Sequence, residues 1–267
     1  PSGAAVRVGP PRSAQGIPAA FGAAGQPLFL AWTDDGDRDS EDLFLQRLSA
    51  TTLEPEGSPS RSTDLVPSGA PRARVVGPRG AVVKDGLRVV FELERKPGSF
   101  IELLSLATSD LGKELTTAGT NREGKASGSL ALVNVDRSRA HAPQLACNAD
   151  LCFVVWHGES PPGAQGAAFD AGSGRNVWRR RFSPNALYPV VAASANGAAA
   201  AWIEDGKLVA APLVRTGFNR PAKVGRASAS QPVISFTPAA EKGQYLAAWL
   251  DMEATLPEPY VARLRCP

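Results

Sequence analysis

The sequence predicts an all-β protein, a five-bladed β-propeller of four-stranded antiparallel blades, and three observations support this. A motif recurs about five times: a proline with two apolar residues, a turn, then a strand of small residues that ends in an aromatic residue. Repeats of this length are typical of propellers and of open arrays. The 26 glycines and 23 prolines among 267 residues suit many short strands joined by turns. Asn-Gly and Asp-Gly pairs between apolar runs indicate tight hairpins.

The copies of the motif are spread over the whole chain. Their prolines are Pro18, Pro71, Pro143, Pro189 and Pro232. Four copies end in tryptophan, namely Trp32, Trp156, Trp202 and Trp249, whereas the degenerate second copy ends at Phe91. Each unit is therefore roughly 45 to 70 residues long, which suits a four-stranded blade. A large aromatic residue at one position of every repeat is expected to pack between neighbouring blades.

The clearest unit spans residues 188–214 and predicts three antiparallel strands. Asn196-Gly197 and Asp205-Gly206 separate its apolar runs, and such pairs favour type I′ turns because both central residues need positive φ. We expect the third strand of the unit to recur in the other copies. Its expected positions are residues 42–48, 100–104, 177–182, 208–213 and 260–264.

The two ends of the sequence suggest how a ring would close. The last copy stops after its third strand, whereas residues 4–8 form an extra apolar strand before the first copy. An N-terminal strand that completes the C-terminal blade would remove the exposed edges of an open array. We therefore expect residues 1–267 to form one closed propeller domain.

The repeated pattern is similar to that of a known group of proteins. Pro-x-Val/Ala, then Leu-Ala-Ala-Trp-x-Asp and Tyr-Val-Ala-Arg-Leu, resembles the tryptophan-containing β-propeller repeats of secreted bacterial proteins. The resemblance covers nearly the whole chain, although only weakly between residues 70 and 130. It implies the architecture and says little about function. The Ser-x-Asp-x-Gly-x-Thr-Trp box of sialidases and the Trp-Asp pair of WD repeats are both absent.

The cysteines bear on the cellular compartment. Cys147 and Cys152 flank a predicted hairpin tip, where facing side chains are compatible with a disulfide, and this would favour an oxidising compartment. Two buried free thiols are the alternative. Cys266 has no predicted partner. With no apolar stretch of about 18 residues to span a membrane, we expect a secreted, periplasmic or outer-surface protein.

A carboxylate follows the tryptophan of each clear copy. These acids are Asp34, Glu159, Glu204 and Asp251. Related positions should lie on one face of a ring, where a pair of carboxylates about 5 to 9 Å apart could hydrolyse glycosides. The alternative is that each acid lies at the turn after its strand and bonds the local backbone.

A second acidic group lies between residues 34 and 42. Oxygens of Asp35, Asp37 and Asp39 could bind calcium, a cation that prefers six to eight oxygen ligands. The glycine of this loop is out of place for an EF-type site, because Gly36 precedes the second acid. A solvated hairpin loop is the alternative. We expect no other cofactor.

Charge and the remaining motifs exclude several functions. The 29 basic and 26 acidic residues give a net charge of +3, too small an excess to indicate nucleic-acid binding. The basic strand at residues 178–182 is interpreted as a structural strand. His141 and His157 are the only histidines, and a lone histidine is more often structural.

The sequence therefore predicts an exported, non-enzymatic binding module that contacts a protein partner through loops on one face. The alternative is a carbohydrate-active propeller, either a lectin or a glycosidase, that uses the acids after the tryptophans.

Overall fold

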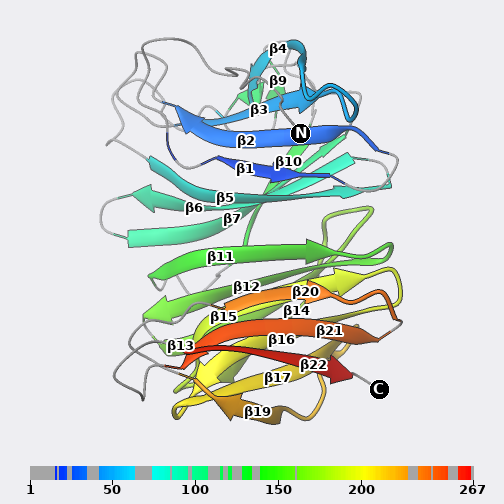
Figure 1. Ribbon diagram of the computed structural model, residues 1–267. Helices are drawn as coiled ribbons and strands as arrows, with labels where there is room; N and C mark the ends of the chain where they lie inside the picture. Colours follow the sequence, from blue (N-terminus) through cyan, green and yellow to red (C-terminus); the bar gives the residue numbers. More distant parts are fainter. Residues whose placement is uncertain are drawn as a thin grey trace. The chain divides into compact units, whose positions relative to one another are not determined.

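Antiparallel β-sheets make up the described part of the chain, in which there is no helix (Figure 1). The computed structural model describes residues 16, 18–22, 26–34, 42–63, 74–84, 86–95, 98–107, 115–116, 120–121, 128–133, 139–159, 161–227, 234–241, 243–251 and 258–265. The all-β prediction is confirmed. The chain divides into two compact units, Pro1–Leu132 and Val133–Pro267.

The first unit contains two four-stranded sheets. One has the order β1 (Ala19–Phe21), β2 (Leu28–Asp34), β3 (Asp42–Leu48), β4 (Pro55–Arg61); the other has the order β10 (Gly128–Leu132), β7 (Gly98–Ala107), β6 (Gly86–Arg95), β5 (Arg74–Val83). A small ribbon joins β8 (Leu115–Thr116) to β9 (Thr120–Asn121). Buried side chains of the two larger sheets, including Phe29, Leu45 and Phe91, form one core.

The second unit contains three sheets. The third sheet has the order β11 (Ala140–Cys147), β12 (Leu151–Glu159), β13 (Pro162–Asp170), β14 (Asn176–Ser183). The fourth has the order β15 (Leu187–Ser194), β16 (Gly197–Glu204), β17 (Lys207–Val214), β18 (Gly217–Phe218), with β19 (Ala222–Arg226) also paired to β17. The fifth has the order β20 (Ile234–Pro238), β21 (Gln244–Asp251), β22 (Glu258–Arg265).

The sheets of the second unit pack face to face. On β16, Ala200 and Trp202 contact the third sheet, whereas Ala201 and Ile203 contact the fifth. Because successive side chains of a strand point to opposite faces, this strand is apolar at nearly every position. The predicted packing of motif tryptophans between neighbouring sheets is confirmed for Trp202 and Trp249.

The structure corrects the assignment of strands in the third sheet. Residues 177–182, expected as the third strand, belong to the fourth strand, β14, and the third strand is β13. Strand β13 consists mostly of glycine and alanine, so it lacks the β-branched residues by which a strand is recognised in a sequence. A small residue is needed at position 166, because a Cβ there would lie 2.5 Å from the ring of Phe182.

A bulge recurs in the first strand of three sheets. The residue before a proline has positive φ in Gly77-Pro78, Ala142-Pro143 and Tyr188-Pro189, and the strand register shifts at each of these pairs. Pro78 is therefore the motif proline of the second sheet in place of Pro71, which lies outside the described residues. Of the two predicted turns, Asp205-Gly206 is confirmed, with φ of 50° and 69°. The prediction of a turn at Asn196-Gly197 is wrong by one residue, because Gly197 begins β16 and pairs with Ser194.

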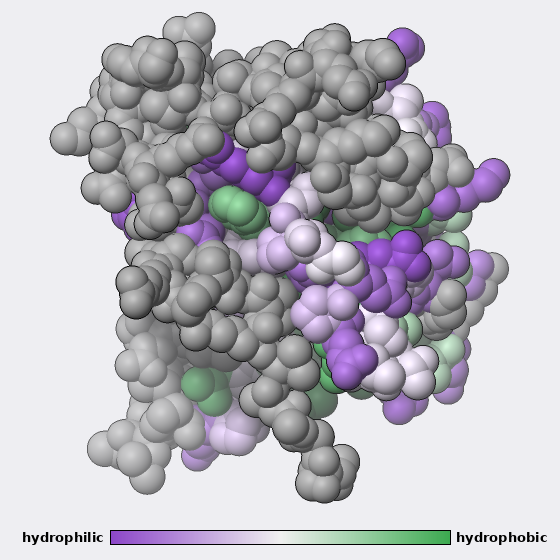
Figure 2. All heavy atoms as spheres, turned by 90° about the horizontal axis from the view of Figure 1, so that it is seen from above, coloured by the Kyte–Doolittle hydropathy of each residue, from purple (hydrophilic) through white to green (hydrophobic). Residues whose placement is uncertain are grey.

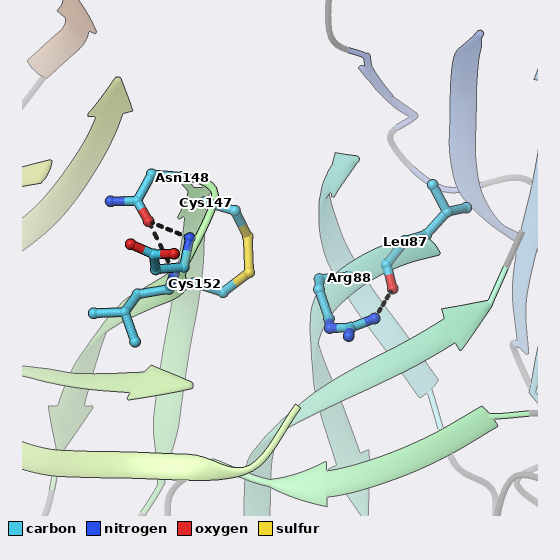
Figure 3. The surroundings of a disulfide bond; sticks show 7 residues. Leu87, Arg88, Cys147, Asn148 and Cys152 are labelled. Atoms are coloured by element: carbon cyan, nitrogen blue, oxygen red, sulfur yellow. Dashed lines mark hydrogen bonds between the residues drawn. A yellow bond between two sulfur atoms is a disulfide. The ribbon is translucent and has the colours of Figure 1, made fainter. Parts of the chain in front are cut away.

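The hairpin between β11 and β12 contains the expected disulfide between Cys147 and Cys152, which are register partners (Figure 3). Asn148 stabilises the tip, because its side-chain oxygen accepts hydrogen bonds from the backbone N–H groups of Asp150 and Leu151, at 3.0 and 2.8 Å. Such a bond fits an oxidising compartment.

The described surface mixes polar and apolar side chains. On the face drawn in Figure 2, hydrophilic side chains are interspersed with smaller hydrophobic areas. Within the described ranges, no helix is long and apolar enough to cross a membrane.

Candidate functional site

Two of the carboxylates after the motif tryptophans accept a hydrogen bond from their own tryptophan. Trp202 Nε1 donates to Glu204 at 3.0 Å, and Ser183 Oγ donates to the other Glu204 oxygen at 2.6 Å. Trp32 Nε1 lies 3.5 Å from an oxygen of Asp34, which is only 1% exposed. The backbone of Asp251 continues β21, and its side chain lies outside the described residues. These contacts give Asp34 and Glu204 a structural partner within their own sheets.

Glu159 lies at a different position of the repeat from the other acids. It lies three residues after Trp156, whereas Asp34 and Glu204 lie two residues after theirs, so that Gly158 holds the equivalent position in this copy. A Cβ at Gly158 would lie 2.3 Å from Gln165 Nε2, so a carboxylate does not fit there. Trp156 Nε1 is accordingly buried without a hydrogen-bond partner in the described part of the chain. Because side chains alternate along a strand, Glu159 lies on the same face as His157 instead.

The predicted calcium ligands Asp35, Asp37 and Asp39 lie outside the described residues. Among the residues that are described, there is no group of three or more histidine, cysteine or acidic side chains that could hold a metal ion.

A polar and aromatic cluster lies where β12 ends and β15 begins. His141 and His157 are register partners on β11 and β12, and His141 Nε2 lies 2.9 Å from Glu159 Oε1. Arg139 approaches the other Glu159 oxygen at 3.7 Å. The ring of Tyr188 stacks on the imidazole of His157, with centroids 6.2 Å apart and planes 14° from parallel. We call these five residues the Tyr188 cluster.

Tyr188 occupies a backbone conformation that disfavours large side chains. Its φ of 53° is left-handed, a region that is rare for bulky residues and costs of order 1 to 3 kcal/mol. At the equivalent bulges the residue is Gly77 or Ala142, both small. Tyr188 also leaves 45% of its surface exposed. Such strain is concentrated at functional sites, and this makes Tyr188 the strongest functional candidate.

His157 is held in its neutral form. Burial lowers its pKa below the ordinary value of 6.5, nearby His141 lowers it further, and Glu159 opposes the shift. Its Nδ1 atom is buried and has no hydrogen-bond partner among the described residues. A neutral imidazole at pH 7 can accept a proton, which is the requirement for a general base.

The lowered pKa of His157 predicts a loss of stability in acid. The unfolded chain binds the proton more readily than the folded chain, so the free energy of unfolding should fall as pH drops below about 6.5. Urea midpoints of the wild type and of His157→Gln at pH about 7.5 and 5.5 measure this. We expect a smaller fall in the variant, whereas His141→Gln should keep most of the dependence. An equal fall in wild type and His157→Gln would contradict the prediction.

The arginines of the basic strand β14 bond to the backbone of neighbouring segments. Each of its three arginines donates to a backbone carbonyl: Arg179 to Val133, Arg180 to Thr216 and Arg181 to Pro162. Arg179 also lies 5.9 Å above the ring of Phe169, and burial lowers its pKa.

The sequence points to Glu159 and His157 but does not show that they lie beside Arg139, His141 and Tyr188. The connection depends on the register of β11 against β12 and on the bulge at Tyr188-Pro189. The one signal available in the sequence was a tyrosine before the motif proline, at the position that Ala142 holds in the preceding copy.

Comparison with known proteins gives a likeness of fold. No family model and no curated protein match the sequence. The fold is similar to that of the polysaccharide lyase Uly1, with a TM-score of 0.55 and 11% identity over 93% of this chain and 57% of that chain. This chain thus spans little more than half the length of Uly1. A weaker likeness is to the α-L-arabinofuranosidase PaAbf62A from Podospora anserina, in complex with cellotriose. It has a TM-score of 0.41 and 12% identity, over 76% of this chain and 68% of that chain.

Proposed function

We propose that this protein is carbohydrate-active, and that it binds and cleaves a polysaccharide at the Tyr188 cluster. The observation that carries the proposal is Tyr188 itself: an exposed aromatic ring, held in a strained backbone conformation, against a neutral histidine. The likeness of fold to a polysaccharide lyase supports the same class of substrate by analogy.

The residues of the cluster suit cleavage of a glycosidic bond by acid–base catalysis. The apolar face of a sugar ring can pack on an exposed aromatic ring. His157, neutral at pH 7, would accept a proton, and the Tyr188 hydroxyl would donate one to the leaving oxygen. Glu159 orients His141 beside them. This arrangement serves either hydrolysis or elimination.

Among the acids after the tryptophans whose side chains the structure describes, only Glu159 belongs to this site. The bonds from Trp32 and Trp202 support structural roles for Asp34 and Glu204. We place a protein-binding module second, because it rests on loops that lie mostly outside the described residues. The disulfide supports export in either case.

The proposal is tested by incubating the purified protein with a panel of neutral and carboxylated polysaccharides. Chain length is followed by size-exclusion chromatography, new reducing ends by a colour reaction, and unsaturated ends by ultraviolet absorbance. Hydrolysis yields reducing ends alone, whereas elimination also yields the unsaturated product. If every polysaccharide in the panel keeps its length, the proposed activity is wrong.

We further propose that the five sheets are blades of one closed propeller. Within the second unit, the first strands β11, β15 and β20 lie side by side in sequence order, as blades around an axis require. The outer edge of β22 has no partner in the described residues, and Val261 there is 72% exposed. Residues 4–8, which the sequence predicts as the strand that completes this sheet, lie outside the described residues.

Deletion of residues 1–10 tests ring closure. We expect a clearly lower melting temperature because an exposed edge replaces a paired one, and we expect a peptide of residues 1–10 added in trans to restore part of the loss. Circular dichroism during heating measures both effects. An unchanged melting temperature would count against closure by this segment.

A further inference from the structure

A short connection between the third and fourth sheets leads directly into Tyr188. It consists of residues 184–186, between the end of β14 at Ser183 and the start of β15 at Leu187. Ala186 is fully buried and belongs to the core between these two sheets. Because Tyr188 is the second residue of β15, the conformation of this connection bears directly on where its ring lies.

The hydroxyl of Ser183 ties this connection to the fourth sheet. It donates a hydrogen bond to Glu204 at 2.6 Å and accepts one from the backbone N–H of Asn185 at 3.3 Å. The side chain of Asn185 in turn approaches Asp205, the residue after Glu204, at 3.4 Å. Glu204 is itself held in place, because Trp202 Nε1 donates to its other oxygen at 3.0 Å. The connection is thus anchored at the point where β16 ends.

A glycine of the third sheet makes room for the same connection. Gly163 has a φ of 114°, and a Cβ there would lie 2.2 Å from Ser183 O and 2.9 Å from Pro184 O. Any larger residue at position 163 would therefore displace this backbone and would also be strained at such a φ. The connection is fixed by close packing on β13 as well as by hydrogen bonds to the fourth sheet.

Tyr188 needs such support because its backbone conformation is unfavourable. A left-handed φ is costly for a bulky side chain, and the following Pro189 favours an extended conformation in the residue before it. Strained residues persist only where the surrounding structure over-determines them. Here the anchored connection precedes Tyr188 and the buried Pro189 follows it, while His157 supports the ring.

We propose that the hydrogen bond from Ser183 to Glu204 positions Tyr188 on His157; this deepens the proposed function and rests on it. Glu204 is then a positioning residue that acts on the Tyr188 cluster through Ser183. Without the bond, the connection is released, and Tyr188 relaxes from its left-handed conformation and leaves the imidazole. The sugar then loses the aromatic ring on which it packs.

The test compares Ser183→Ala with Ser173→Ala in the full chain. Ser173 is the matched control, because its hydroxyl also donates to an acid, Asp170, at 2.8 Å and accepts from a backbone N–H two residues on, that of Arg175, at 3.4 Å. It lies in the turn between β13 and β14 instead. The readout is the imidazole proton signal of His157 in nuclear magnetic resonance spectra, since a stacked aromatic ring shields these protons.

Tyr188→Gly gives the position of the His157 signal without the stacked ring. We expect Ser183→Ala to move the signal towards that position and Ser173→Ala to leave it unchanged. In a double variant of Ser183→Ala and Tyr188→Gly, the signal should stay where Tyr188→Gly places it. An unchanged signal in Ser183→Ala would overturn the proposal, as would a shift that persists in full without the tyrosine.

Cleavage provides a second readout that separates this inference from the proposed function. Ser183→Ala should cleave roughly tenfold more slowly than Ser173→Ala, because a small displacement of a group that holds the substrate slows the reaction. A shifted His157 signal in a protein that cleaves no polysaccharide would contradict the proposed function and leave the positioning role standing. Cleavage that requires Tyr188 but is as fast in Ser183→Ala as in the control would do the reverse.

Discussion

Replacing Trp202 by alanine should lower the free energy of unfolding by about 3 to 5 kcal/mol, the range for a large aromatic removed from a core. Trp202 is fully buried, its ring stacks on Phe182 with centroids 5.2 Å apart, and its Nε1 donates to Glu204. Truncation therefore leaves a cavity between the third and fourth sheets and removes a partner of a carboxylate. Urea denaturation followed by circular dichroism measures the loss.

The control for this prediction is Tyr260→Ala. Tyr260 stacks on Trp249 at 5.8 Å but is 42% exposed, so its removal should cost less than about 1 kcal/mol. Similar losses in the two variants would show that the motif tryptophan has no special place in the core, and the packing account of the repeat would be wrong.

Replacing Tyr188 by glycine should reduce polysaccharide cleavage at least about 100-fold while leaving the fold intact, because the change removes a group in contact with the reacting sugar. Glycine accepts the φ of 53° without strain, so we expect stability to stay constant or to rise by up to about 1 kcal/mol. Initial rates on the substrate found in the panel, and urea midpoints, give the two readouts.

Ala142→Gly is the matched control, because Ala142 has the same left-handed backbone conformation before the motif proline of the third sheet. It should change stability similarly and leave cleavage near the wild-type rate. A Tyr188→Gly protein that is less stable and still active would show that the ring serves packing alone.

The sheets could be predicted from the sequence because each repeat contains similar turn residues and a similar apolar run that ends in an aromatic residue. Asp205-Gly206 fixes one hairpin by its positive φ values, and facing cysteines fix another. The prediction failed for β13, where glycines and alanines fill a strand buried on both faces and no β-branched run marks it. In the second sheet it selected Pro71, whereas the bulge lies at Gly77-Pro78, because proline spacing alone does not show where a strand changes register.

The candidate site was harder to predict because it depends on contacts between strands. Asp34 and Glu204 were predicted as site residues because an acid recurs at this position of the repeat. A residue that recurs in every repeat usually stabilises the repeat itself, and both acids accept a hydrogen bond from their own tryptophan. Tyr188 departs from the repeat, and its significance follows only from its φ and from its neighbour His157.

The most direct test of the proposed site uses the two histidines as reporters. The chain contains only His141 and His157, so side-chain nitrogen correlation spectra should show two imidazoles that are simple to assign with His141→Gln. An oligosaccharide of the substrate is titrated in at pH about 7, using a variant that binds but does not cleave. We predict that the signals of both histidines move in proportion to occupancy, with His157 moving most. Saturable binding that leaves both imidazole signals unchanged would contradict the account and place the carbohydrate site elsewhere.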